Sequence, residues 1–211
     1  MKKSIGKVFM AMGLLLVLAA AGLLAYNTRE SSRAGQASSR ILTQLTEEMP
    51  QAETPQTETR SEETEPAILR EMTVKTVDGL DYIGYLSIPE LELELPVQAQ
   101  WSYDGLQKSP GRFSGSTFSD DLTVCAHNYP AHFGRLRSLS QGEEIDFIDM
   151  DGMVWIYEVS YVTVLEPEDV EQMTDKDPED TWGLTLFTCT PGGKTRVTIR
   201  CEKAEVSDFA E

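Results

Sequence analysis

A cysteine and an arginine stand on either side of a glycine-rich turn near the carboxyl end of the chain. The segment TLFTCTPGGKTRVTIRC, residues 185–201, places Cys189 at the end of an apolar run, crosses a Pro-Gly-Gly turn and returns along a second run. Alternation along the returning strand sends Arg196 and Arg200 to the face beside the cysteine. Because a nearby cation stabilises a thiolate, which is a strong nucleophile, the segment predicts an activated thiol.

Two histidines are present that can act as the acid or base partner of such a thiol. His127 directly follows the apolar run LTVCA, so it stands at a strand end where its side chain can face a groove. His132 lies beyond Pro130, in a loop or in the first turn of a helix. This position favours His127 as the partner, and the alternative interpretation is a solvated loop histidine.

The other two cysteines, Cys125 and Cys201, have simpler interpretations. Each belongs to an apolar strand and is expected to be a small buried side chain. Three cysteines leave at least one thiol unpaired, and a disulfide between Cys125 and Cys201 stays an alternative, because the sequence does not set the Cα separation. A zinc site built from Cys125, His127, His132 and Cys189 is not favoured, because no closely spaced pair organises these ligands.

The chain is strongly acidic, with a formal net charge of −17. Such a surface repels nucleic acid, so no nucleic-acid partner is expected. Calcium is an alternative for the acidic side chains of Glu143, Glu144, Glu166, Glu168 and Asp169, but a solvated charged face is favoured. We therefore expect no cofactor.

Short alternating or apolar runs separated by turn residues begin near residue 82, a pattern typical of an all-β domain. Strands are expected at 82–88, 91–97, 122–126, 144–150, 153–165, 184–188 and 195–201. A helical turn is expected at 133–139, where Phe133, Leu136 and Leu139 recur at helical spacing. Seven to eight strands with few short helices predict a closed β-barrel, because closure removes exposed edges.

Three tryptophans, Trp101, Trp155 and Trp182, are able to line a peptide groove. Aromatic side chains of this kind are more often part of a core. Trp182 is the preferred groove candidate, because it precedes the strand that ends at Cys189.

The amino terminus carries a predicted membrane anchor. Residues 8–26 are free of charge and just long enough to cross a hydrocarbon core, and three lysines precede them. The positive-inside rule places residues 27–211 on the outer side of the cytoplasmic membrane. A cleaved signal peptide is the alternative, and in either case the remaining chain is exported.

A polar, acidic segment follows the anchor. Residues 46–66 hold seven Glu and three Pro with hardly an apolar side chain, so they cannot bury a core. We expect a charged, extended spacer that holds the domain away from the membrane, preceded by a short helix through Ile41 and Leu45. The predicted division begins with a cytoplasmic stub and transmembrane anchor at 1–26 and an extracellular acidic linker at 27–76. A β-barrel domain follows at 77–205 and a tail at 206–211.

Three segments together resemble the sortases, bacterial cell-wall transpeptidases that join surface proteins carrying an LPXTG-like sorting signal to an amine. TLFTC followed by an arginine on the next strand resembles the nucleophile motif of that family. The segment LTVCAHNYPAHFGRLRSLSQGEEIDF resembles its histidine segment, and YIGYLSIPELELELPV its opening pair of strands. The resemblance covers residues 77–203.

This resemblance implies a sortase-like barrel in which Cys189 is the nucleophile and His127 the general acid and base. Arg196 would position the substrate and stabilise the oxyanion, with Arg200 as the alternative arginine. The implied partners are surface proteins that carry a sorting signal, and an amine of a peptidoglycan precursor or a pilin. The segment 166–183 resembles the variable loop that reads the signal.

A non-catalytic exported β-barrel that binds or assembles other proteins is the second class of function. The presence of Cys, His and Arg in this order argues against it. A papain-like cysteine protease is not favoured either, because such an enzyme carries its nucleophile on a helix, whereas Cys189 ends a predicted strand.

Overall fold

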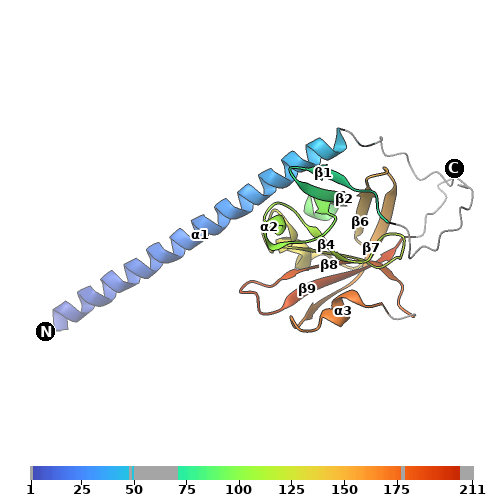
Figure 1. Ribbon diagram of the computed structural model, residues 1–211. Coiled ribbons are helices and arrows are strands. Elements are labelled where there is room, and N and C mark those ends of the chain that lie inside the picture. Colours follow the sequence, from blue (N-terminus) through green and yellow to red (C-terminus); the bar gives the residue numbers. More distant parts are fainter. Residues whose placement is uncertain (1, 48, 50–70, 177–178, 205–211) are drawn as a thin grey trace, which may run out of the picture.

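Eight β-strands close into a barrel in the computed structural model, which describes residues 2–47, 49, 71–176 and 179–204 (Figure 1). The strands are β2 (Leu80–Ile88), β3 (Leu93–Gln98), β4 (Gly111–Ser114), β5 (Leu122–Ala126), β6 (Glu144–Asp149), β7 (Val154–Leu165), β8 (Trp182–Cys189) and β9 (Arg196–Lys203). Their spatial order is β2-β3-β4-β5-β8-β9-β7-β6, and β6 pairs with β2 to close the ring. A short additional strand, β1 (Lys75–Val77), pairs with the start of β2. The predicted closed barrel of seven to eight strands is confirmed.

Two strand pairs in the ring are parallel. β3 and β4 meet in parallel at Gln98 and Gly111. β5 and β8 run parallel over their whole contact, which ends at the pair Ala126 and Thr188. A parallel pair brings the carboxyl ends of both strands to the same edge, so the residues that follow β5 and β8 meet at one rim of the barrel.

Alternation along the strands divides their side chains between the interior and the outer surface of the barrel. The interior holds one large apolar core to which most strands contribute, for example with Leu86, Leu122, Ile145, Leu186 and Ile199. Val197, Ile199 and Cys201 of β9 belong to this core, as the alternation predicts. The residues between them face outward, on the same side as Cys189.

All seven predicted strands are present, with ends displaced by no more than two residues, and the predicted helical turn is the 3-10 helix η3 (Phe133–Ser138). β1 and β4 were not predicted. β4 lies within SPGRFSGST, whose glycine, proline and serine residues indicate turns. Gly111 is needed there for a different reason, because a Cβ at this position would lie 2.8 Å from the Cα of Trp101.

Three short helices besides η3 occupy connections between strands. The 3-10 helix η2 (Pro89–Leu91) joins β2 to β3, α2 (Tyr103–Leu106) lies between β3 and β4, and α3 (Val170–Thr174) lies between β7 and β8. Leu106 of α2 and Met173 of α3 pack with Phe187 on the outer surface of the barrel. The helices α2 and α3 therefore form walls on either side of β8.

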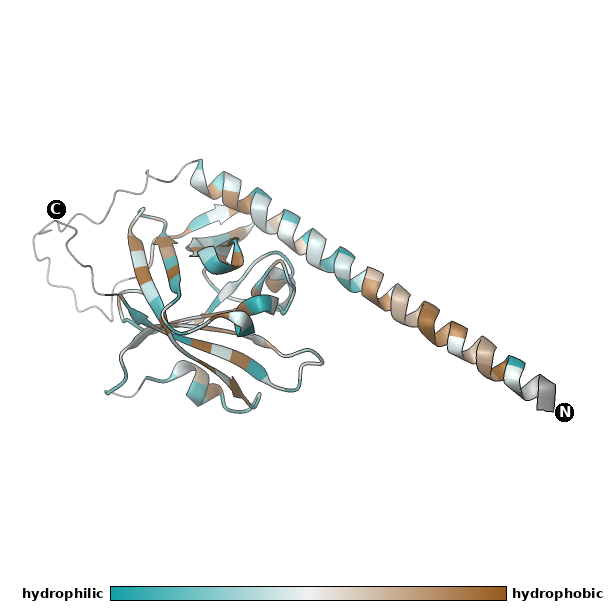
Figure 2. Ribbon diagram, turned by 180° about the vertical axis from the view of Figure 1, so that it is seen from behind, coloured by the Kyte–Doolittle hydropathy of each residue, from teal (hydrophilic) through white to brown (hydrophobic). Residues whose placement is uncertain are grey.

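The amino-terminal helix α1 (Lys2–Thr46) runs without interruption for 45 residues. Its first half is apolar and exposed, and it is long and apolar enough to be a candidate membrane span (Figure 2). Its second half lies against the barrel, where Ser38, Ile41 and Leu45 are buried. Ile41 and Leu45 pack on an apolar cluster that includes Tyr82.

This arrangement differs from the linker expected over residues 27–76. Residues 27–46 continue the helix, and burial begins at Ser31, about 8 Å along the helix axis from Tyr26. The barrel thus lies against the second half of α1, which directly follows the apolar half. The expected short helix through Ile41 and Leu45 is present as the last turns of the longer helix α1, whereas residues 48 and 50–66 of the expected acidic spacer lie outside the described residues.

Candidate active site

His127 and Cys189 occupy equivalent places at one rim of the barrel. Each of them follows by one residue the last pair of the parallel strands β5 and β8, which is Ala126 with Thr188. Neighbouring strands lie about 4.8 Å apart. The hydroxyl of Thr188 donates a 2.8 Å hydrogen bond to the Ala126 carbonyl and ties the two strand ends together. The imidazole and the thiol are therefore brought to the same place from positions far apart in the sequence.

Arg196 is the strand partner of Cys189 across the antiparallel pair of β8 and β9. Thr190 and Thr195 close the turn between these strands, with a backbone bond of 2.9 Å and a bond of 2.9 Å between their hydroxyls. One terminal nitrogen of Arg196 donates to the carbonyls of Gly193 and Thr195, each at 3.1 Å. Nε and the other terminal nitrogen make no hydrogen bond to the described residues, which leaves donors for a ligand.

His127, Cys189 and Arg196 line a single groove on the outer surface of the barrel, with a volume of about 210 Å³. The remainder of its lining is mainly apolar and includes Leu106, Cys125, Phe187, Pro167, Val170 and Met173. A groove with an apolar floor and a few polar groups at one place is the usual form of a site for an organic ligand such as a peptide.

An aromatic cluster forms one side of this groove. Trp101 stacks on Phe113 with their ring centres 5.8 Å apart, and Phe113 meets Phe187 edge to face at 5.2 Å. Tyr103 meets Trp101 edge to face at 5.3 Å. Sequence reasoning missed Phe113 and Phe187, and it missed β4, the strand that carries Phe113. The one signal for Phe187 was its position two residues before Cys189, because alternate residues of a strand face the same side.

The preference for Trp182 as the groove tryptophan is wrong. Trp182 begins β8, at the end of the strand opposite to Cys189, and the structure places it against Tyr161 and Arg200. Trp101 lines the groove instead. Trp155 packs at the edge of the core and donates a 2.9 Å hydrogen bond to Asp149.

The three thiols differ in their surroundings. Cys189 is half-buried, whereas Cys125 lies in the groove floor and burial raises the pKa of its thiol to about 12. Cys201 is enclosed in the barrel core, and burial raises its pKa as well. All three thiols are free, and Cys125 and Cys201 lie on opposite faces of the barrel wall, so the alternative of a disulfide between them is not realised.

The two histidines are also distinguished. His127 is half-buried in the groove, and burial lowers its pKa, which favours the neutral imidazole that can accept a proton from a thiol. His132 is completely buried away from the groove, and burial, followed by the charge of His127, lowers its pKa to about 4. In the described part of the chain, no three His, Cys, Asp or Glu side chains are grouped so as to hold a metal ion.

Arg200 faces outward like Arg196 but does not line the groove. Its guanidinium is buried over the ring of Trp182, with 4.2 Å between Cζ and the ring centre. It donates hydrogen bonds to the carbonyls of Met173, at 3.1 Å, and Gln172, and to the Thr185 hydroxyl. Arg200 therefore fixes the carboxyl end of α3, which is part of the groove wall.

Comparison with known proteins gives one family. The family model described as Sortase domain matches residues 86–204, more than half of the chain. Among solved structures, the chain is similar to sortase C1 from Streptococcus suis, with 28% identity over 62% of this chain and 76% of that chain and a TM-score of 0.51. Sortase C1 from Streptococcus agalactiae is similar at 25% identity over 63% and 72%, with a TM-score of 0.53.

A lid mutant of sortase A from Corynebacterium diphtheriae has the same fold, at 22% identity over 60% of this chain and 72% of that chain, with a TM-score of 0.53. No curated protein sequence matches the chain at a significant level.

Proposed function

The chain belongs to the sortase family of transpeptidases, and from this premise we propose that it cleaves an LPXTG-like sorting signal through a thioester on Cys189. It would then transfer the bound protein to an amine of the cell wall or of a pilin. His127 and Arg196 are the proposed partners of the nucleophile.

The observation that carries this proposal is the meeting of three side chains in one groove. Cys189 and His127 follow the last pair of two parallel strands, and Arg196 is the register partner of Cys189. This arrangement provides a nucleophile, a proton carrier and a hydrogen-bond donor for a developing oxyanion within reach of one bound peptide.

In the first half-reaction, the neutral His127 takes the proton of the Cys189 thiol, and the sulfur attacks the threonine carbonyl carbon of the sorting signal. The tetrahedral oxyanion accepts hydrogen bonds from the donors of Arg196 that the turn leaves unused. Collapse of this intermediate breaks the peptide bond, and His127 supplies the proton that the leaving amine needs. The acyl group remains on Cys189 as a thioester.

In the second half-reaction, the amine acceptor attacks the thioester carbonyl. His127, now neutral, takes the proton of the attacking amine, and the thiolate of Cys189 leaves. A new amide bond replaces the one that was cleaved. Water competes with the amine acceptor, and its attack on the thioester would release the signal by hydrolysis. The apolar walls of the groove favour an acceptor amine carried on a peptide chain over bulk water.

We place the barrel on the outer side of the cytoplasmic membrane, with the first half of α1 as a single-pass anchor. Support comes from the apolar, exposed character of this half of the helix and from the lysines that precede it. Accessibility of residues in the barrel to an impermeant reagent in intact cells tests this orientation.

The decisive test uses a fluorescent sorting peptide and the full-length protein. Cys189→Ala should abolish both thioester formation, seen by mass spectrometry, and peptide cleavage. Cys125→Ala and Cys201→Ala are matched controls that should retain both. Turnover of the peptide by Cys189→Ala would refute the mechanism, and a binding module without catalysis would form no thioester in any variant.

A further inference from the structure

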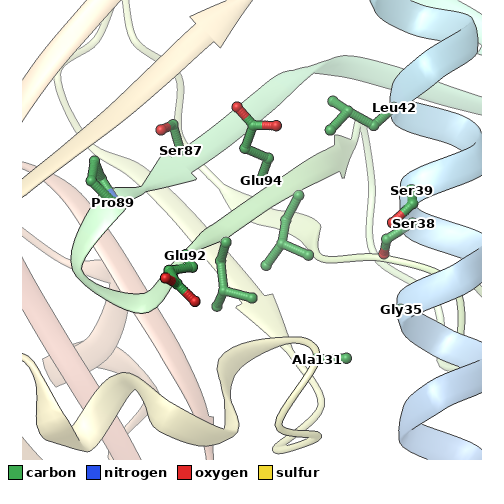
Figure 3. A pocket seen from close by; sticks show the side chains of 11 residues that line it. Gly35, Ser38, Ser39, Leu42, Ser87, Pro89, Glu92, Glu94 and Ala131 are labelled. Carbon is green, nitrogen blue, oxygen red and sulfur yellow. The ribbon is translucent and has the colours of Figure 1, made fainter.

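The loop that carries His127 is covered by the second half of α1. This histidine loop, residues 127–132, joins β5 to η3. The backbone N–H of Ala131 donates to the Ser31 hydroxyl at 3.3 Å. Gly35 lies so close to Ala131 that a Cβ on the glycine would be 3.0 Å from the Ala131 Cβ, and Figure 3 shows Ala131 beside this part of the helix. The helix therefore touches the histidine loop directly.

A buried hydrogen bond joins the helix to the other end of the same loop. Nε2 of the completely buried His132 lies 3.2 Å from the Ser38 hydroxyl oxygen. That hydroxyl donates its own hydrogen to the Lys108 carbonyl at 2.6 Å, so it accepts the hydrogen of the His132 Nε2. Ser38 thus connects three segments, which are α1, the histidine loop and the residues that precede β4.

The connection continues from His132 to His127 through Tyr129. The ring centres of His132 and Tyr129 are 5.8 Å apart, and those of Tyr129 and His127 are 5.0 Å apart. The loop backbone is also folded on itself. The backbone N–H of His132 donates to the Tyr129 carbonyl at 2.9 Å, and the backbone N–H of Phe133 donates to the His127 carbonyl at 3.3 Å. Displacement of His132 would therefore displace His127.

We propose that Ser38 and His132 are positioning residues through which the second half of α1 holds the His127 imidazole beside Cys189. Neither side chain lines the groove with Cys189, so both act through His127. The inference rests on the proposed function for the role of His127. It means that the anchor helix contributes to the geometry of the site as well as to its location at the membrane.

The test uses the full-length protein in detergent micelles with histidine labelled at Cε1. The chain has two histidines, so the spectrum holds two signals, and His132→Gln identifies them. Ser38→Ala removes the buried hydroxyl, and Ser39→Ala, at the exposed neighbouring position, is the matched control. His132→Gln keeps an N–H donor near the position of Nε2, whereas His132→Ala does not.

The pKa of His127 should be lowered equally in three proteins, which are the wild type and the variants Ser39→Ala and His132→Gln. In Ser38→Ala and His132→Ala, its pKa should rise toward the ordinary value of about 6.5, because the loop is no longer held and the ring gains solvent. The kcat for peptide cleavage should fall about tenfold or more in these two variants, with a smaller change in KM, as expected for misplacement of a catalytic group.

An unchanged His127 titration in Ser38→Ala would overturn the proposal, and so would an equal shift in Ser39→Ala. If Ser38→Ala does not fold, the comparison of His132→Gln with His132→Ala decides by the same signal, and identical titrations of His127 in the two overturn it. The titration is recorded without substrate. Failure of the transpeptidase mechanism, seen as turnover by Cys189→Ala, is therefore distinct from failure of this inference.

Discussion

Arg196 and Arg200 face the same side of β9 and yet have opposite surroundings. Arg196 stands at the turn beside Cys189 with unused hydrogen-bond donors, while Arg200 is only 2% exposed and is bonded to two backbone carbonyls of α3. This contrast favours Arg196 over the alternative Arg200 as the arginine that contacts substrate. It also predicts different losses when each is replaced by lysine.

Arg196→Lys should leave the fold intact and impair acylation by about a hundredfold, as for loss of an oxyanion donor. The planar guanidinium can give two parallel hydrogen bonds to a developing oxyanion, whereas the ammonium of lysine is a point charge. Single-turnover thioester formation measures the effect, and a melting curve checks the fold. Wild-type acylation by this variant would remove Arg196 from the mechanism.

Arg200→Lys should act mainly on stability and substrate binding. Lysine loses the stack on Trp182 and leaves at least one buried carbonyl without its partner, which costs about 2 kcal/mol. The melting temperature should therefore fall by about 4–8 °C. The KM for the sorting peptide should rise more than kcat falls, because α3 forms a wall of the groove. Unchanged melting would contradict this role, and Arg196→Lys is the control.

Thiol reagents should distinguish the three cysteines. At pH 8 the folded protein should take up one equivalent of iodoacetamide, at Cys189, because Cys125 is buried with its pKa raised to about 12 and Cys201 is enclosed in the core. Peptide mass mapping identifies the site, and the unfolded protein should take up three equivalents. Modification of Cys125 at a rate comparable to that of Cys189 would show that the groove floor is open to solvent.

His132 should make the protein less stable in mild acid. Its pKa is about 4 in the folded protein and about 6.5 when unfolded, so the unfolded state binds the extra proton between these values. The stabilisation is fully present above pH 6.5 and falls as the pH decreases toward 4, with a loss of about 2 kcal/mol between pH 7.5 and 5.

Thermal unfolding of the full-length protein at these two pH values measures this difference. His132→Gln lacks the titrating imidazole, so its melting temperature should decrease less over the same interval. An equal decrease in the variant and the wild type would assign the acid sensitivity to other groups.

Much of the architecture follows from local patterns in the sequence. The period of two along 195–201 predicted which side chains of β9 enter the core, and the Pro-Gly-Gly turn predicted that Arg196 returns beside Cys189. The charge-free run at 8–26 predicted the apolar, exposed first half of α1, which is a candidate membrane span. These features are decided by neighbours in the chain, through backbone geometry and hydrophobic burial, and need no knowledge of distant contacts.

The tertiary structure decided the features that depend on contacts between distant segments. The parallel pairing of β5 with β8 brings His127 to Cys189, and no local pattern fixes which strands become neighbours. The packing of α3 determines that Arg200 is buried while Arg196 is available, although both follow the same alternation. The docking of α1 likewise turns His132 from a loop histidine into a buried partner of Ser38, because burial is a property of the assembled surfaces and not of the residue itself.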